Sequence, residues 1–158
     1  MKKNLVIIPT YNEKENIEKI ILKVFSLSKK FDILIVDDGS PDGTASIVKN
    51  IQFKFPDSLY IEERTGKLGL GTAYIHGFKW ALKNNYDYIF EMDADFSHNP
   101  DDLIKLLDAC SLSNGDVSIG SRYINGVNIV NWPMSRLLMS FFASKYVKII
   151  TGMPVQDS

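Results

Sequence analysis

The chain has 158 residues, of which 45% are hydrophobic and 23% are charged. This size and composition fit one globular domain and exclude a disordered or fibrous chain. Eighteen basic and nineteen acidic residues give a formal net charge of -1, so no positive field is available to hold nucleic acid, and we expect no nucleic-acid partner.

The first half of the chain alternates short apolar runs with helical patterns. The apolar run 5–8 predicts a strand buried on both faces, and apolar residues recur at helical spacing from Ile17 to Phe25. Asn12 is the expected N-cap of that helix, with Glu13 in its first turn. A second buried strand lies in FDILIVDDGSPDG, followed by a short helix over 44–51.

The second half continues the alternation. We expect a strand over 59–62, a helix over 72–82 that follows the glycines of KLGLGTAYIHG, and a strand over 87–92 that runs into DADFSHNP. Asn99 and Pro100 fit the N-cap and first position of a helix over 101–109 that leads to Cys110, and 117–120 is one more expected strand. The pattern predicts a doubly wound α/β domain with a mostly parallel sheet and helices on both faces.

Neither an export signal nor a membrane span is expected. MKKNLVIIPTYNE has no small-residue cleavage site, and the apolar run 137–150 is shorter than the roughly 18 residues that a span needs and carries Lys145 and Lys148. The single cysteine, Cys110, can form no intramolecular disulfide, which fits a reducing compartment, and we expect it in the core. Because the sequence stops at TGMPVQDS without a closing element, it is expected to be truncated at its C-terminal end.

Three polar clusters follow predicted strands, namely PTYNE at 9–13, DDGS at 37–40 and DAD at 93–95. Ligands of open α/β sheets bind beyond the carboxyl ends of the strands. Acidic clusters gathered at one edge would repel one another. We therefore expect a cation there, or hydrogen-bond donors such as those of a base and a ribose.

The pair Asp93 and Asp95 is the sharpest of these features. Two carboxylates separated by one residue can both reach a divalent ion, and Mg²⁺ is typically held by one or two carboxylates together with substrate phosphates. The alternative is a chance pattern, or Asp95 and Ser97 capping the next helix. Asp38 suits a nucleoside or, alternatively, caps its turn, while Tyr11 offers a ring for a base.

Basic residues that could bind phosphate are Arg122, Arg136 and Lys67. A lone arginine is ordinarily a solvated surface residue, but the position of Arg122 after an expected strand end favours a functional role, whereas that of Arg136 rests on its place before the apolar run. His76 is expected in a helix and His98 in a loop, neither with the partners of a metal or nucleophile site. No phosphate-binding G-x-x-x-x-G-K-[ST] loop and no G-x-G-x-x-G after the first strand is present in the sequence.

The motifs PTYNE, IVDDGSPDGT, KLGLGTAYIHG, MDADFSHNP and GSRY, in this order and spacing, closely resemble the dolichyl-phosphate (polyprenyl-phosphate) mannosyltransferases of glycosyltransferase family 2. The resemblance covers essentially the whole chain. It implies a single GT-A-type nucleotide-sugar-binding catalytic domain over 1–158, GDP-mannose as donor, a polyprenyl or dolichyl phosphate in a membrane as acceptor, and Mg²⁺ or Mn²⁺ as cofactor.

The resemblance also implies roles for particular residues. The donor-binding residues would be Pro9, Tyr11, Glu13, Val36, Asp38, Asp93, Ala94, Asp95 and Arg122. The catalytic residues would be Asp93, Asp95 and Arg122, and the acceptor-binding residues Arg136 and Ser140. The metal ligands would be Asp93, Asp95 and Ser97, where some family members have Gln in place of Ser97.

A phosphate acceptor explains why no catalytic base stands out. Its second pKa is near 6, so it is mostly a dianion at neutral pH and can attack the sugar in a single displacement with inversion. The run 137–150 could lie at a membrane interface or pack on the sheet, and we expect a peripheral protein at the cytoplasmic face of a membrane, with an anchoring segment or partner subunit outside this chain.

Three alternatives remain at this point. A UDP-glucose-dependent polyprenyl-phosphate glucosyltransferase has a similar overall pattern. FDILIVDDGS also resembles the acidic strand end of a receiver-type phospho-acceptor module, and YIFEMDADFS resembles the nucleophile strand of aspartyl-phosphate phosphatases. In both of those classes the acidic strand comes first, whereas here other elements precede it.

Overall fold

The computed structural model describes residues 2–113, 115–121 and 134–152, and of Arg136 and Leu137 it describes the backbone alone. The chain divides into two compact units, Met1–Leu107 and Asp108–Ser158. We describe each unit by itself. A single catalytic domain over 1–158 therefore stays a prediction.

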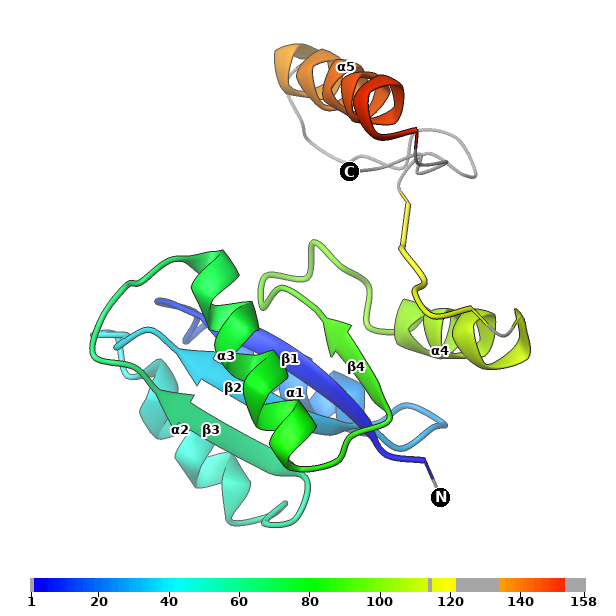
Figure 1. Cartoon of the computed structure of the whole chain (residues 1–158). Helices are drawn as coiled ribbons and strands as arrows, with labels where there is room; N and C mark the ends of the chain where they lie inside the picture. Colours follow the sequence, from blue (N-terminus) through cyan, green and yellow to red (C-terminus); the bar gives the residue numbers. More distant parts are fainter. Residues whose placement is uncertain (1, 114, 122–133, 153–158) are drawn as a thin grey trace. The chain divides into compact units, whose positions relative to one another are not determined.

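The first unit is built on a sheet of four parallel strands (Figure 1). These are β1 (Asn4–Thr10), β2 (Asp32–Asp37), β3 (Leu59–Glu63) and β4 (Tyr88–Glu91), in the order β3-β2-β1-β4. The chain moves outward from β1 to β3 and then crosses back to place β4 on the other side of β1. The reversal beside β1 is a topological switch point, where α/β sheets bind their ligands.

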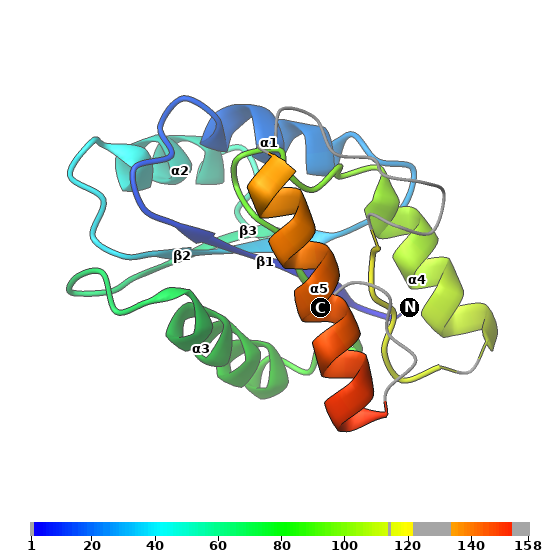
Figure 2. The same cartoon turned by 90° about the horizontal axis from the view of Figure 1, so that it is seen from above.

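Helices cover both faces of this sheet (Figure 2). One face carries α1 (Ile17–Phe25) and α2 (Thr44–Gln52), and the other carries α3 (Leu70–Lys83). Successive side chains of a strand point to opposite faces. Accordingly Val6 and Ile8 of β1 pack with the first pair of helices, while Leu5 and Ile7 pack with α3. The predicted fold class, with its parallel sheet between two helical layers, is confirmed.

A glycine lets α3 lie very close to the central strand. A Cβ atom added at Gly77 would stand 2.7 Å from Cγ2 and 2.8 Å from Cδ1 of Ile7. Ile7 is fully buried, so its side chain has little room to move away. The spacing between α3 and β1 therefore depends on the missing side chain at Gly77.

The predicted N-cap at Asn12 is wrong. Asn12 has a φ of 63°, and α1 begins only at Ile17, after Asn16. The reason is tertiary, because the N–H of Asn12 donates to Oγ of Ser40 and the N–H of Glu13 donates to Oγ1 of Thr44. These bonds tie the segment after β1 to the β2–α2 turn, so the helix starts about one turn later than an N-cap at Asn12 would place it, at the residue where its apolar spacing begins.

Two expectations for the later part of the chain also differ from the structure. Residues 117–120 form no strand within the described part of the chain, and Cys110 is half-buried in α4 (Asp102–Ser113) instead of lying in the core. The first turns of α4 do reach the core through Leu103 and Leu107. As expected, the side chain of Asn99 caps this helix start by accepting a hydrogen bond from the N–H of Asp101.

The second unit contains α5 (Met134–Thr151), which covers the whole of the predicted apolar run. The helix is followed by Gly152, whose φ of 68° and N–H bond to the carbonyl of Lys148 are typical of a helix terminus closed by glycine. Among the helices of the described residues, none combines the length and the hydropathy needed to span a bilayer.

Candidate functional site

Polar loops gather at the carboxyl edge of the sheet because its four strands run in parallel. The segments 11–16, 38–43, 64–69 and 92–101 each follow a strand of this sheet. All three of the clusters predicted from the sequence therefore lie at the same edge. β1 and β4 flank the switch point, so PTYNE and DAD follow neighbouring strands.

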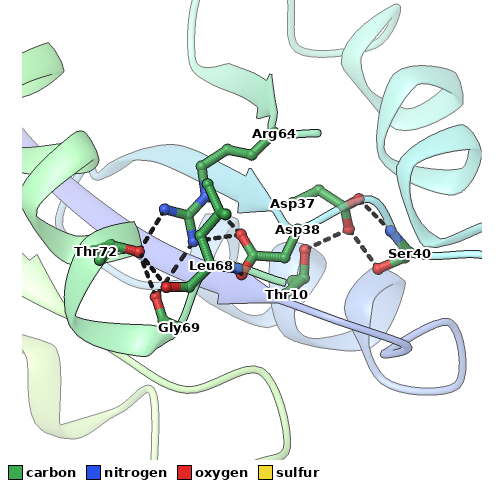
Figure 3. A network of polar contacts seen from close by, with 8 residues as sticks. All are labelled: Thr10, Asp37, Asp38, Ser40, Arg64, Leu68, Gly69 and Thr72. Atoms are coloured by element: carbon green, nitrogen blue, oxygen red, sulfur yellow. Dashed lines mark hydrogen bonds and ion pairs between the residues drawn. The ribbon is translucent and has the colours of Figure 1, made fainter. Parts of the chain in front are cut away.

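Asp37 ties the ends of two strands together. Its carboxylate accepts hydrogen bonds from Oγ1 of Thr10 at 2.8 Å and from Oγ of Ser40 at 2.6 Å, while the N–H of Ser40 donates to its second oxygen at 2.8 Å (Figure 3). The residue is only 1% exposed. The carboxylate of Asp37 thus stabilises the turn that contains Asp38.

Asp38 forms an ion pair with Arg64 that is almost closed to water. Nε of Arg64 donates to Oδ1 of Asp38 at 2.6 Å, Nη2 contacts the same oxygen, and the N–H of Leu68 donates to Oδ2 at 3.2 Å (Figure 3). The two side chains are 8% and 9% exposed. The carboxylate of Asp38 is therefore fixed in direction by a partner that directly follows the next strand.

Arg64 also reaches the start of α3. Nη1 donates to Oγ1 of Thr72 at 2.8 Å and Nη2 to the carbonyl of Gly69 at 3.3 Å, while the N–H of Arg64 bonds the carbonyl of Asp37. Sequence reasoning missed this residue. The available signal was its position directly after the strand of residues 59–63, at the same carboxyl edge as the acidic clusters.

The residues predicted around the nucleoside lie beside this network. Pro9 and Val36 are register partners in β1 and β2, and Val36 is fully buried on the α3 side of the sheet. Tyr11 is 38% exposed, with Nζ of Lys67 4.7 Å from the centre of its ring. Lys67, predicted as a phosphate ligand, thus contacts an aromatic face in this structure.

Glu13 lies in the segment between β1 and α1. It is half-buried, its backbone is held by Thr44, and its Oε2 lies 3.4 Å from Nδ2 of Asn16. Thr44 in turn donates through Oγ1 to Asp42 at 2.6 Å. The β2–α2 turn therefore supports both the Tyr11–Glu13 segment and its own helix.

Asp93 is held from two sides. Tyr74 of α3 donates its phenolic O–H to Oδ1 of Asp93 at 3.2 Å, and the N–H of Asp93 donates to Nδ1 of His98 at 3.3 Å. Burial first, and then the negative charge of Asp93, raise the pKa of the Tyr74 phenol, which therefore keeps its proton at neutral pH. The sequence did not indicate that Tyr74 or His98 contacts this carboxylate.

Asp95 lies two residues on, beyond the buried Ala94. Burial raises its pKa, but hydrogen bonds from the side chain and N–H of Ser97 outweigh this, so the pKa of Asp95 lies below its usual value. Asp95 is consequently ionised at neutral pH. Burial and, after it, the charge of Asp93 raise the pKa of the neighbouring Glu91.

These donors fit a divalent cation that is bound together with a substrate. Within residues 2–113, 115–121 and 134–152, no group of three or more His, Cys, Asp and Glu side chains could hold a metal by itself. Asp93, Asp95 and the hydroxyl of Ser97 form a partial set of oxygen ligands at an exposed edge. Mg²⁺ is commonly bound in this way, with waters and phosphate oxygens completing its shell.

Two predicted phosphate-binding side chains lie outside the described residues. These are Arg122, of which the structure describes nothing, and the side chain of Arg136. Ser140 lies within α5, where its carbonyl accepts a hydrogen bond from Oγ of Ser144 at 3.0 Å. The roles expected for these three residues stay predictions.

Two curated relatives match almost the whole length of this chain. A polyprenol monophosphomannose synthase of Mycolicibacterium smegmatis is 44% identical over 156 residues, covering 99% of this chain and 58% of that protein. An undecaprenyl-phosphate mannosyltransferase of Micrococcus luteus is 43% identical over 153 residues, covering 97% of this chain and 62% of that protein. The chain thus spans about three fifths of the length of these relatives.

Solved structures agree on the fold. A mannosyltransferase from Pyrobaculum calidifontis, in complex with GDP-Man and Mn²⁺, superposes with a TM-score of 0.50 at 30% identity, over 59% of this chain and 27% of that one. TarS 1-349 of S. aureus superposes with a TM-score of 0.62 at 24% identity, over 84% and 37% of the two chains. The latter comparison supports the fold alone, which is the predicted GT-A-like α/β architecture.

The family assignment rests on a match that takes in both compact units. The sequence-family model described as "Glycosyl transferase family 2" matches residues 5–156. This range includes all three strand-end clusters and the Asp38–Arg64 pair. A chain with that match, and with relatives above 40% identity over almost its whole length, belongs to glycosyltransferase family 2.

Proposed function

We propose that this chain carries the donor site of an enzyme that transfers mannose from GDP-mannose to a polyprenyl or dolichyl phosphate. The observation that carries the proposal is the similarity of 44% and 43% identity, over nearly the whole chain, to two polyprenol-phosphate mannosyltransferases. The GDP-Man and Mn²⁺ bound to a structural neighbour support the same donor and the same kind of cofactor.

In this proposal the nucleoside binds at the carboxyl ends of β1 and β2. Tyr11 offers a partly exposed ring, and Glu13 and Asp38 offer carboxylate oxygens to the donors of a base and a ribose. The rigid Asp38–Arg64 pair supports this role, because a carboxylate fixed by a buried cation presents its remaining lone pairs in one direction. Pro9 and Val36, which are register partners in β1 and β2, are proposed to line the same nucleoside site.

Asp93, Asp95 and Ser97 would hold the Mg²⁺ or Mn²⁺ ion, with Ala94 anchoring the loop in the core. A bound divalent ion supplies positive charge for the diphosphate that leaves with the nucleoside. Arg122 is proposed to meet the same diphosphate. The described residues of the site act by orienting the donor and by stabilising its charge.

The proposed reaction needs no protein base. A phosphate monoester has a second pKa near 6, so the acceptor is mostly a dianion at neutral pH. An oxygen of that dianion attacks the anomeric carbon as the bond to the nucleoside diphosphate breaks, which gives inversion at the sugar. Arg136 and Ser140 are proposed to bind the acceptor phosphate, and a product with retained configuration would contradict this mechanism.

We also propose that the second unit contacts the membrane that holds the acceptor, at its cytoplasmic face. α5 combines a largely apolar sequence with Lys145 and Lys148, a composition typical of helices that lie at a membrane interface. An anchoring segment or partner subunit outside this chain is part of the same proposal.

Thermal unfolding with nucleotides tests the donor site. We expect GDP-mannose and GDP to raise the melting temperature in the presence of Mn²⁺, and the shift to shrink strongly in EDTA. A ligand present at about 100 times its dissociation constant stabilises the folded state by about 2.7 kcal/mol. UDP and UDP-glucose are tested in parallel. A larger shift with these uridine nucleotides would indicate UDP-glucose instead of GDP-mannose as the donor.

Two variants make this experiment specific. Asp95→Ala is expected to lose the Mn²⁺-dependent part of the shift. Asp57→Ala removes an exposed carboxylate just before β3, at the opposite edge of the sheet, and is expected to keep it. An absence of any shift with all four nucleotides, or an equal loss in both variants, would contradict the proposed donor site.

A further inference from the structure

Helix α3 contributes a side chain to the acidic pair. Tyr74 belongs to the first half of α3 and donates its O–H to Oδ1 of Asp93 at 3.2 Å. Asp93 itself is 39% exposed. An exposed carboxylate rotates freely unless something holds it, and a phenol that is itself partly buried supplies a fixed donor.

The position of Tyr74 is set by the packing of its helix. Its ring stacks on Phe78, with the centroids 6.4 Å apart, and Gly77 lies against Ile7 of β1. At the helix start, Thr72 bonds Arg64. Tyr74 thus lies between two points at which α3 is held to the sheet, one at the carboxyl edge and one on β1, so its O–H is offered to Asp93 from a fixed helix.

The backbone of Asp93 is restrained independently. Its N–H donates to Nδ1 of His98, and Nε2 of the same ring lies 4.0 Å from Oδ2. His98 therefore restrains the main chain, while Tyr74 holds one carboxylate oxygen. The other oxygen, Oδ2, has Nε2 of His98 as a neighbour, and His98 belongs to the same loop as Asp95 and Ser97.

We propose that Tyr74 is a positioning residue that fixes the Asp93 carboxylate in the orientation in which it binds the divalent cation. The inference rests on the proposed function, because it assumes that Asp93 is a metal ligand. Hydrogen-bond partners of metal-ligating groups orient the ligands, and their removal typically weakens metal affinity by about 10–100-fold.

The chain offers a matched control. Tyr86 donates its O–H to Oδ2 of Asp32 at 2.9 Å, and its ring stacks on Trp80 of α3. Asp32 begins β2, at the amino edge of the sheet and far from the acidic pair in the strand direction. Tyr86→Phe therefore removes the same type of bond as Tyr74→Phe without touching the proposed site.

The test is the affinity of the chain for Mn²⁺ in the presence of GDP, measured from the signal of free Mn²⁺ in electron paramagnetic resonance. We expect Tyr74→Phe to weaken Mn²⁺ binding about tenfold or more and Tyr86→Phe to leave it unchanged. The affinity for GDP in EDTA should be the same in both variants and in the unmodified chain. A general loosening of the fold would alter that metal-free affinity.

Asp93→Asn separates the two proposals. If Asp93→Asn abolishes Mn²⁺ binding while Tyr74→Phe matches Tyr86→Phe, the positioning role is wrong and the metal site stands. If Asp93→Asn leaves Mn²⁺ binding unchanged, or if the unmodified chain binds no Mn²⁺ with GDP, the metal site itself is refuted and the role of Tyr74 with it.

Discussion

The adjacent residues Asp37 and Asp38, at the end of β2, have different partners and different roles. Asp37 accepts hydrogen bonds from Thr10 and Ser40, whereas Asp38 is paired with Arg64. Their sequence, DDGS, indicates only that acids follow a strand. The distinction depends on Arg64, which lies 26 positions later and reaches Asp38 only when β3 pairs with β2.

The Asp38–Arg64 pair leads to a prediction on stability. Arg64→Ala leaves the nearly buried Asp38 carboxylate without its cation, and breaking a buried pair in this way typically costs about 3–5 kcal/mol. The free energy of unfolding in urea is the measurement. Lys49→Ala is the control, since it breaks a pair with Glu63 whose side chains are 50% and 46% exposed, and such pairs contribute roughly 0–1 kcal/mol. Equal losses in the two variants would contradict the buried character of the first pair.

At the scale of the helices and strands, the local pattern was enough for most of the fold. The apolar runs of β1 and β2 and the helical spacing of α1 predicted those elements because burial on two faces or one face leaves a distinct period. The N-cap at Asn12 failed because Ser40 and Thr44, from another loop, hold that segment. The prediction of a strand over 117–120 was wrong, because a short apolar run in the sequence does not show whether a neighbouring strand is available to pair with it.

The same reasoning explains what was found at the site. Asp93 and Asp95 were identifiable because two acids after a strand are locally unusual. Tyr74 was not, since tyrosine in an amphipathic helix ordinarily packs in a core, and its contact with Asp93 spans 19 positions. Contacts of this kind follow from how α3 lies on the sheet, which the local sequence does not contain.

The close approach of α3 to β1 predicts unequal effects of two similar substitutions in one helix. Gly77→Ala places a Cβ against the buried Ile7 and is expected to lower the free energy of unfolding by about 1–3 kcal/mol. Gly71→Ala meets open space in the first turn of α3 and should be neutral or stabilising by up to about 1 kcal/mol. Thermal or urea unfolding distinguishes them, and a stable Gly77→Ala variant would show that the helix can shift outward without loss.

At the scale of the whole molecule, membrane contact should depend on where charge lies and not on its total. The chain carries a formal net charge of -1, so an anionic vesicle does not attract it overall. The proposed contact instead involves Lys145 and Lys148 of α5, and a lysine close to an anionic surface contributes about 1 kcal/mol. The position of these charges is therefore open to a direct test.

Vesicle flotation with anionic lipid provides that test. Reversing both charges in Lys145→Glu/Lys148→Glu is expected to weaken vesicle binding by at least about 2 kcal/mol, or roughly 30-fold. Lys54→Glu/Lys83→Glu makes the same change in net charge at exposed residues of the first unit and should have a smaller effect. Equal weakening in both variants would assign the attraction to net charge and argue against α5.

The order of the strands also bears on how the chain folds while it is being synthesised. β1, α1, β2, α2 and β3 leave the ribosome in an order that lets one side of the sheet assemble step by step, whereas the face formed by Leu5 and Ile7 waits for α3. At about 5–20 residues per second, the delay between β1 and the end of α3 is roughly 4–16 s. During that interval the nascent sheet exposes an apolar surface on its central strand, and a chaperone that binds extended hydrophobic segments would find its target there.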